Sequence, residues 1–262
     1  MRYINVGSGS KGNSTIIYNS QTVLLIDCGI TKKRVTVALA SIGKTLTDIT
    51  AVLVTHRHSD HTACMNAFAG LEPCLFSGDE GILDTKFKDS NHLHPFQELL
   101  EKTFAVTALP TSHDAPESMG YLIKDTESKE RMLYMTDTGY IPAKDLALAG
   151  NCNFYILESN HDPEMLMHSS RSNWLKMRIL GDKGHLSNEQ ASHYLSLMIG
   201  GQTKEIAMAH LSEECNTPAL ALQTFRDVML AQTGAVPAIV VKTLSQHDPT
   251  TGGDIILGGT KL

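Results

Sequence analysis

Three histidines and an aspartate lie within six residues of one another, in the segment His56-Arg57-His58-Ser59-Asp60-His61. Neutral imidazoles and carboxylates are the ligands that hold zinc and similar divalent ions. Four such side chains in so short a segment cannot all reach one ion. The spacing therefore favours two neighbouring ions, with His56 and His58 on one and Asp60 and His61 on the other. The alternative interpretation is a polar turn that happens to be rich in histidine.

Three more candidate ligands stand in the same kind of place as this first cluster, directly after an apolar run that predicts a strand. The strands and the residues that follow them are Ile49–Thr55 with the first cluster, Phe104–Leu109 with His113, Arg131–Tyr134 with Asp137, and Ile206–Ala209 with His210. A lone histidine after a strand is more often structural than a ligand. The repeated placement nevertheless indicates one site built at strand ends.

The elements that must position these residues read as an α/β fold. Further predicted strands are Arg2–Gly7, Ser14–Tyr18, Val23–Asp27, Leu93–Phe96, Gly120–Lys124, Phe154–Glu158 and Ala238–Val241, and predicted helices are Lys32–Ile42, Pro163–His168, Asn188–Met198 and Thr217–Gln232, with a helix start at Cys64–Phe68. Neither a repeat nor a linker divides the chain. We therefore expect a single domain over residues 1–262, with two sheets packed between helical layers.

The composition limits the classes of protein that fit. Hydrophobic residues make up 42% of the 262 residues and charged residues 19%, which are globular values. No apolar run approaches the length of a membrane span and the N-terminus lacks a signal-peptide core, so we expect a cytoplasmic protein without a membrane partner. The net charge of -6 argues against avid non-specific binding of nucleic acid. Two divalent ions would offset about four of those charges at the site.

The first cluster resembles the His-x-His-x-Asp-His signature of the metallo-β-lactamase superfamily of hydrolases, and its spacing matches in full. The resemblance implies a four-layer αββα sandwich, with two mixed β-sheets flanked by helices. It also implies a dinuclear centre with one ion on His56, His58 and His113, the other on Asp60, His61 and His210, and Asp137 bridging them together with a water or hydroxide.

The same resemblance implies roles around the metal ligands. Asp60 would orient the hydroxide, and Asp27 would brace the histidine loop, although Asp27 also reads as a turn residue before Gly29. Members that run iron redox chemistry usually carry glutamate where this chain has His58, and many β-lactamases lack the histidine at position 61. A hydrolytic centre is therefore favoured. Zinc suits the ligands best, while manganese and iron remain open.

A second motif, Gly184-His185-Leu186-Ser187, resembles the Gly-His-Ser-Thr segment of tRNA 3′-processing endonucleases of this superfamily. There the histidine contacts the scissile phosphate and helps to protonate the leaving group, a task that suits an imidazole. Glu158 resembles the glutamate that supports it. The resemblance thus implies catalytic roles for His185 and Glu158. Alternatively, Ser187 and Gln190 form a capping box, and His185 merely flanks a helix.

A basic segment leads up to this motif. Residues 171–185 carry Arg171, Lys176, Arg178 and Lys183 against Asp182 alone. We expect Arg171, Lys176 and Arg178 to bind substrate, although a solvated helix face would look the same. In residues 7–14, a glycine-rich loop, Asn13 and Ser14 are candidate phosphate contacts, and a tight hairpin turn is the alternative.

Longer stretches of the chain, among them Gly7–Ser14, Glu158–Asp162 and Ala209–Glu214, resemble the bacterial YycJ/WalJ-type metallo-hydrolases, which are described as DNA exonucleases or phosphodiesterases. The resemblance implies a dinuclear metal-dependent phosphodiesterase, an exonuclease-like DNA nuclease in which a metal-bridged hydroxide attacks phosphorus. Nucleic acid or another phosphodiester would be its substrate. The rival hypotheses are an acyl hydrolase of thioesters, lactones or amides on the same centre, and a metal-bound regulatory or binding module without turnover.

Overall fold

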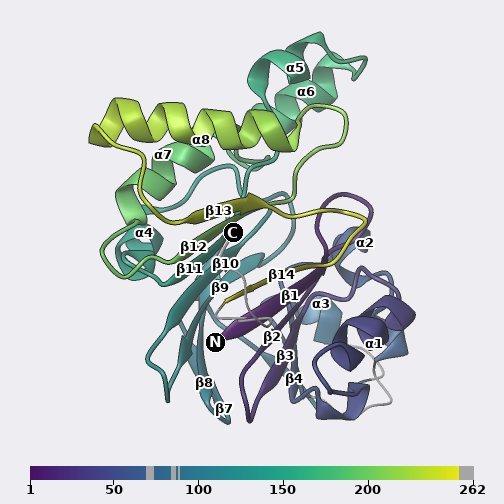
Figure 1. Cartoon of the computed structure of the whole chain (residues 1–262). Coiled ribbons are helices and arrows are strands. Elements are labelled where there is room, and N and C mark those ends of the chain that lie inside the picture. Colours follow the sequence, from purple (N-terminus) through teal and green to yellow (C-terminus); the bar gives the residue numbers. More distant parts are fainter. Residues whose placement is uncertain (69–73, 84–86, 88, 254–262) are drawn as a thin grey trace.

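The strands form two seven-stranded sheets in the computed structural model, which describes residues 1–68, 74–83, 87 and 89–253 (Figure 1). Across the first sheet the order is β14 (Thr250–Gly253), β1 (Arg2–Gly7), β2 (Ser14–Tyr18), β3 (Val23–Ile26), β4 (Ala51–Val54), β5 (Cys74–Ser77) and β6 (Ser90–His92). Across the second sheet it is β13 (Val240–Thr243), β12 (Glu205–Ala209), β11 (Phe154–Glu158), β10 (Arg131–Met135), β9 (Met119–Asp125), β8 (Phe104–Pro110) and β7 (Glu98–Glu101).

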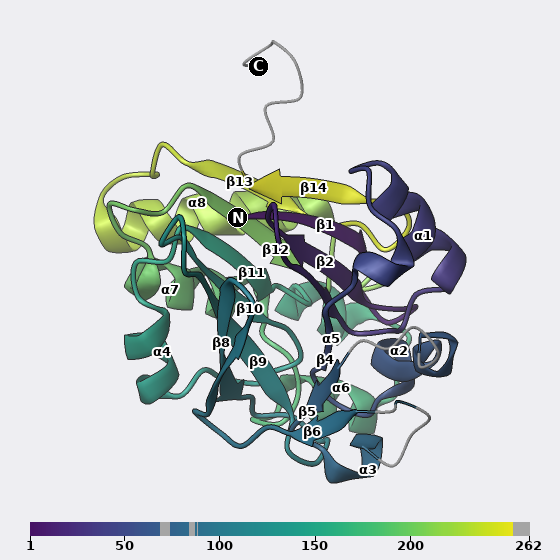
Figure 2. The ribbon, with the colours of Figure 1, turned by 90° about the horizontal axis from the view of Figure 1, so that it is seen from below.

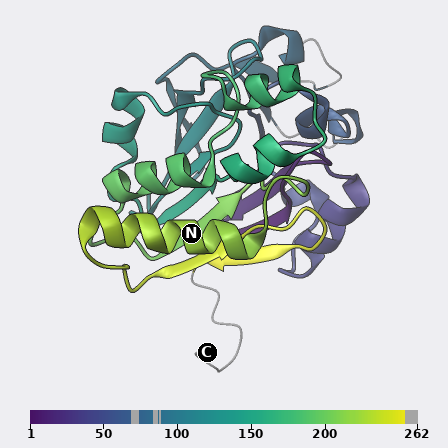
Figure 3. The same cartoon turned by 90° about the horizontal axis from the view of Figure 1, so that it is seen from above.

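Most of the helices cover the outer faces of the two sheets. They are α1 (Lys32–Ala40), α2 (Ser59–Thr62), α3 (Glu80–Leu83), α4 (Ala143–Ala149), α5 (Pro163–His168), α6 (Asn173–Leu180), α7 (Asn188–Met198) and α8 (Pro218–Thr233), with short 3₁₀ turns at Leu46–Asp48 and Met65–Ala67. Figure 2 shows α4, α7 and α8 on the side of the second sheet and α1, α2 and α3 on the side of the first. The view from above shows α7 and α8 lying side by side (Figure 3). This is the predicted four-layer sandwich of two mixed sheets flanked by helices.

The alternation of side chains along each strand explains the layers, because successive residues point to opposite faces. In β3, Leu24 and Ile26 pack into the core between the two sheets, together with residues of the second sheet such as Tyr134. Val23 and Leu25 pack into a separate core under α1. Both faces of the sheet are thus apolar, as expected for strands covered on both sides.

One predicted strand is wrong. His94, Pro95 and Phe96 form a turn between β6 of the first sheet and β7 of the second, rather than a strand over Leu93–Phe96. Proline has no N–H for a sheet, and Phe96 has a φ of 64°, outside the extended region. The helix start expected at Cys64–Phe68 is only the 3₁₀ turn Met65–Ala67. The single-domain organisation over 1–262 stays a prediction, and its last nine residues lie outside the described part.

The mixed topology brings the ends of several strands to one edge. In the first sheet β3 and β4 run parallel, and in the second β10, β11 and β12 run parallel, while β8 is antiparallel to β9, which is antiparallel to β10. Except for β9, these strands have their carboxyl ends at one edge, and the loops that leave them there bring the candidate ligands together. Among the described residues, none of the helices combines the length and apolar character needed to cross a bilayer.

Candidate metal centre

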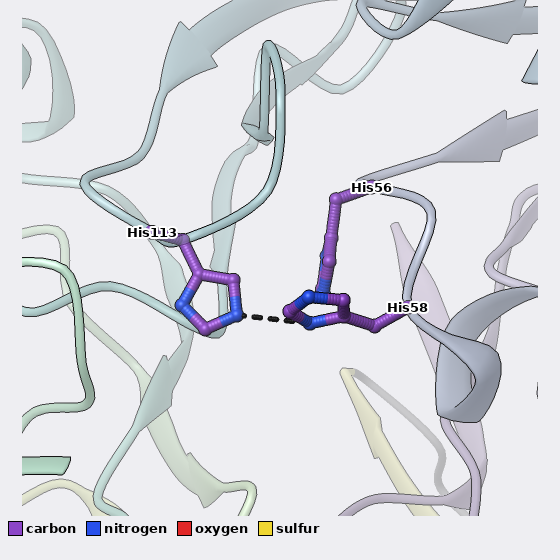
Figure 4. A group of neighbouring side chains, drawn as sticks. All are labelled: His56, His58 and His113. Carbon is purple, nitrogen blue, oxygen red and sulfur yellow. Dashed lines mark hydrogen bonds between the residues drawn. The ribbon is translucent and has the colours of Figure 1, made fainter. Parts of the chain in front are cut away.

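Three imidazoles from two loops meet at the edge between the sheets (Figure 4). His56 and His58 follow β4, and His113 follows β8 in the other sheet. One ring nitrogen from each of the three lies within 4.8 Å of the others, and His113 Nε2 is 3.2 Å from His58 Nδ1. We call this group the open half, because the side chain of His58 is 33% exposed.

Neutral oxygen atoms orient two rings of the open half. The Nδ1 of His113 donates to the carbonyl oxygen of Gly184 at 3.3 Å, and the hydroxyl of Thr55 lies 3.0 Å from His56 Nδ1. Each contact turns the opposite ring nitrogen, Nε2, toward the cluster. Burial lowers the pKa of His56 and of His113 below the usual range, which keeps both imidazoles neutral and able to bind a cation.

The remaining predicted ligands, Asp60, His61, His210 and Asp137, form what we call the braced half. One ligand atom each from Asp60, His61 and His210 lies within 4.8 Å of the others. The carboxylate of Asp137 lies 3.2 Å from His61 Nε2 and 3.5 Å from His210 Nε2. Asp137 also groups with His56 of the open half, so its carboxylate stands between the two halves.

Buried carboxylates orient the two imidazoles of the braced half. The Nδ1 of His61 donates to Asp27 at 2.7 Å, and both side chains are fully buried. Asp27 in turn accepts a hydrogen bond of 2.8 Å from the backbone N–H of Thr55. The Nδ1 of His210 lies 3.2 Å from Glu158 Oε1. Burial opposes protonation of these imidazoles, but the carboxylates outweigh it and raise the pKa of His61, and that of His210 to about 10.

Buried polar atoms without hydrogen-bond partners support a cation at this cluster, independently of any resemblance to a sequence motif. Buried polar atoms normally have hydrogen-bond partners. Within the described part of the chain, His56 Nε2, His210 Nε2 and Asp137 Oδ2 are buried without one, and all three belong to this cluster. Asp27, Asp137 and His210 also have φ values of 60°, 57° and 56°, a strained region for residues with a side chain. All seven predicted ligands are brought together, and their binding of metal stays a prediction.

His185 and Glu158 lie beside the braced half. The Nδ1 of His185 donates to Glu158 Oε1 at 2.7 Å, and the ring of His185 stacks on His210 with centroids 5.5 Å apart. Burial opposes protonation, but Glu158 and Asp137 raise the pKa of His185 above its usual value. Glu158 is itself fixed by the backbone N–H groups of Thr138 and Leu186. The capping box of Ser187 and Gln190 is present as well, so the alternative interpretation holds beside this arrangement.

A cavity of about 130 Å³ opens next to these imidazoles, and we call it the phosphate cavity after the ligand that is proposed for it below. His185 and His210 line it, together with Arg171 and Arg178. The Nε of Arg178 donates to Asp114 at 2.5 Å and the Nε of Arg171 to Glu214 at 2.9 Å, so both guanidinium groups are held in place. Two of the three predicted basic contacts thus face the centre.

Three predicted substrate contacts have other roles. Lys176 is only 8% exposed, and its ammonium donates to the carbonyl oxygen of Met167, which ties α6 to α5. Ser14 is fully buried and donates to the backbone carbonyl of Asp27. The amide of Asn13 lies 3.3 Å from Asp60 Oδ2 and 3.0 Å from His61 Nε2. These side chains support the centre or the fold, and we remove them from the proposed substrate contacts.

Two supporting residues were missed in the sequence. The hydroxyl of Thr55 contacts Asp27, His56 and His61, and so touches both halves. The amide of Asn160 donates to the backbone carbonyl of His210 and lines the phosphate cavity. Thr55 precedes the histidine cluster directly, and a hydroxyl in that position was the available signal. For Asn160 the available signal was its place in Glu158–Asp162, one of the stretches that carry the resemblance.

The chain has relatives of similar sequence and fold among known proteins. The model of the β-lactamase superfamily domain matches residues 22–206. The exodeoxyribonuclease WalJ of Streptococcus pneumoniae is 35% identical, over 85% of this chain and 86% of the relative. The exodeoxyribonuclease YycJ of Bacillus anthracis is 31% identical, over 86% and 87%. The solved structure of the metallo-β-lactamase fold protein YhfI from Bacillus subtilis has a TM-score of 0.72 at 14% identity and covers 96% of this chain and 99% of its own, which shows a shared fold.

Proposed function

The chain belongs to the β-lactamase superfamily, and from this premise we propose that it is a metal-dependent phosphodiesterase that degrades DNA as an exonuclease. Two relatives that match more than four fifths of the chain are named exodeoxyribonucleases. Because the match covers most of both chains, the same arrangement of catalytic groups is expected here. DNA is the proposed partner, and a cytoplasmic location stays a prediction.

The observation that carries the proposal is the position of His185. Its Nδ1 is engaged by Glu158 at 2.7 Å, so its Nε2 is the nitrogen available to the phosphate cavity. An imidazole with a raised pKa keeps its proton to a higher pH and can pass that proton to a leaving oxygen. Phosphodiester cleavage needs such an acid, because the departing alkoxide is a poor leaving group without a proton.

The arginines supply the second requirement of phosphodiester chemistry, which is a place for a dianionic or monoanionic phosphate. Arg171 and Arg178 line the same cavity as His185, and guanidinium groups bind phosphate through paired hydrogen bonds. Their own carboxylate partners hold them in place without removing all their donors.

The seven clustered ligands would hold two divalent ions, His56, His58 and His113 one of them and Asp60, His61 and His210 the other, with Asp137 shared. Such ions lower the pKa of water and neutralise charge on a reacting phosphate. Asp60 stands at the edge of the braced half, 3.4 Å from His61 Nε2, where its carboxylate can orient a water molecule. The choice among zinc, manganese and iron is left to experiment.

The test is cleavage of end-labelled single- and double-stranded DNA, and of methyl p-nitrophenyl phosphate, by protein loaded with Zn²⁺ or Mn²⁺. We expect stepwise shortening of DNA, and its loss in Asp137→Asn. Asp227→Asn, an exposed change on α8, is the matched control and should keep full activity. Cleavage of p-nitrophenyl acetate or thioesters without any cleavage of phosphodiesters would support the acyl hydrolase instead.

A further inference from the structure

A larger cavity of about 410 Å³ adjoins the phosphate cavity. Leu211 and Ser212, which directly follow His210, line both cavities. The phosphate cavity, at about 130 Å³, is smaller than the pockets that hold whole small molecules, whereas the larger one has the usual size. A ligand whose phosphate lies at His185 therefore has a neighbouring space for the rest of the molecule.

The lining of the larger cavity differs from that of the phosphate cavity. Leu211, Leu244 and Pro218 give it an apolar surface, and Thr243 reaches it from β13. No arginine or lysine lines it within the part of the chain that the structure describes. Such a surface suits an uncharged ring rather than a second phosphate.

Three hydroxyl groups at this apolar surface can each donate a hydrogen bond to a ligand. Ser212 Oγ accepts the backbone N–H of Cys215, Thr217 Oγ1 accepts that of Leu220, and Ser245 Oγ accepts that of His247, each at 3.1 Å. A hydroxyl that accepts in this way keeps its own proton to donate. Among the described contacts none of these three protons has an acceptor, so the cavity offers donors to a ligand with ring nitrogens or carbonyl oxygens.

The charge at the rim is already balanced. Glu213 lines the larger cavity, and its carboxylate accepts from Lys11 at 2.5 Å and from His247 at 2.6 Å. Because two cationic or polar donors hold this carboxylate, it does not repel a phosphate bound next door as strongly as a free one would.

We propose that this cavity is a nucleobase subsite, which holds the base of the nucleotide whose phosphate lies at His185, Arg171 and Arg178. The inference rests on the proposed function, since it takes the phosphate cavity as the place of the reacting phosphate. It assigns to the protein a preference for nucleotides over other phosphate esters. The preference comes from the apolar wall and hydroxyl donors and needs no contact with a second base.

The test is calorimetric binding of thymidine 5′-monophosphate and of methyl phosphate to the Mn²⁺-loaded protein. We expect the nucleotide to bind at least about tenfold more tightly, as burial of one base against the apolar wall allows. Thr243→Trp fills the cavity and should remove this advantage while methyl phosphate binds as before. Val240→Trp, an exposed change on the same strand outside the cavity, is the matched control and should keep it.

Specific binding results would contradict the nucleobase subsite. Equal affinity for the two ligands in the unchanged protein, or an undiminished advantage in folded Thr243→Trp, would overturn the subsite. Pro218→Trp, at the exposed rim, repeats the test if Thr243→Trp does not fold. Binding needs no turnover, so a protein that binds the nucleotide selectively but cleaves no phosphodiester would contradict the proposed function and leave the subsite standing.

Discussion

The open and braced halves of the centre hold their histidines in different ways. In the open half, a hydroxyl of Thr55 and a backbone carbonyl of Gly184 orient His56 and His113. In the braced half, the carboxylates of Asp27 and Glu158 orient His61 and His210. A carboxylate behind an imidazole makes the imidazole a more basic, more firmly oriented ligand. Histidines only a few ångströms apart are therefore expected to bind a cation with different affinities.

The electrostatics and the exposure of the histidines also differ between the two halves. Burial lowers the pKa of His56 and opposes protonation of His61 too, but Asp27 and Asp137 raise the pKa of His61, and a cation that displaces that proton would meet the same two carboxylates. His58 is 33% exposed while His61 is fully buried. We infer that the braced half attracts and retains a cation, and that the open half exchanges its cation more readily and faces the substrate.

The largest effect is expected from His61→Ala. This change leaves the buried carboxylates of Asp27 and Asp137 without their shared partner, which should lower the free energy of unfolding by about 3–5 kcal/mol and abolish activity. His58→Ala, in the open half, should also abolish activity but lower the free energy of unfolding by less than about 1 kcal/mol. Urea denaturation of both variants measures the difference. Equal destabilisation would break the comparison.

The next effect concerns His185, the proposed acid, which shares the carboxylate of Glu158 with His210 of the braced half. His185→Ala should lower kcat on DNA about 10²–10⁴-fold. The loss should be much smaller on methyl p-nitrophenyl phosphate, whose leaving group needs no proton. Stopped-time assays on both substrates give the two ratios. A similar loss on both would mean that His185 only binds phosphate, and metal content equal to that of the unchanged protein is the required control.

A smaller effect is expected from Asp27→Asn, which keeps the shape of the brace and removes its charge. Metal affinity of the braced half should fall about 10–100-fold, while that of the open half changes little. Competition with a chromogenic chelator resolves the two steps. Asp125→Asn, at another buried carboxylate, which accepts from the backbone N–H groups of Glu127 and Ser128 outside the centre, is the matched control. An equal loss in that variant would show that the effect is not specific to the brace.

The last effect lies outside the centre. It concerns Asp145, a buried carboxylate that lacks the hydrogen-bond partners of Asp27. Asp145 on α4 is fully buried, neither oxygen has a hydrogen-bond partner among the described residues, and burial raises its pKa to about 6. Because this pKa exceeds the unfolded value of about 3.9, its unfavourable contribution grows as pH rises through that interval. Asp145→Asn should raise the free energy of unfolding by up to about 3 kcal/mol at pH 8, the free-energy equivalent of that pKa difference, and by nothing near pH 4. Thermal melts at both pH values decide, and a gain of equal size at both would refute this cause.

The seven candidate ligands could be singled out because each follows an apolar run that predicts a strand, and the resemblance to the superfamily motif implied how they group; their binding of metal stays a prediction. The strained φ values of Asp27, Asp137 and His210 could not be predicted, since each depends on how a loop closes over the other sheet. The histidine spacing thus indicated the candidate ligands, and the resemblance indicated Asp27 and Glu158 as supports, whereas the supporting role of Thr55 became visible only in the fold.

The structure gives Lys176, Ser14 and Asn13 partners within the protein, because tertiary packing sets the direction of their side chains. Lys176 belongs to a basic segment, but the packing of α6 on α5 turns its ammonium to Met167. Ser14 and Asn13 lie in a glycine-rich loop that could hold phosphate, yet the loop packs under the centre and bonds to Asp27 and Asp60. Composition does not distinguish a side chain that faces a substrate from one that is buried by packing, because the residue types are the same in both cases.

The measurement that tests the account most directly is a titration of metal-free protein with Mn²⁺, following bound metal and cleavage of labelled DNA together. The braced half should fill first, so cleavage should stay near background through the first equivalent and rise with the second. Full activity at one equivalent, or no cleavage of DNA with two equivalents bound, would contradict the assignment of a braced and an open half to one phosphodiesterase centre.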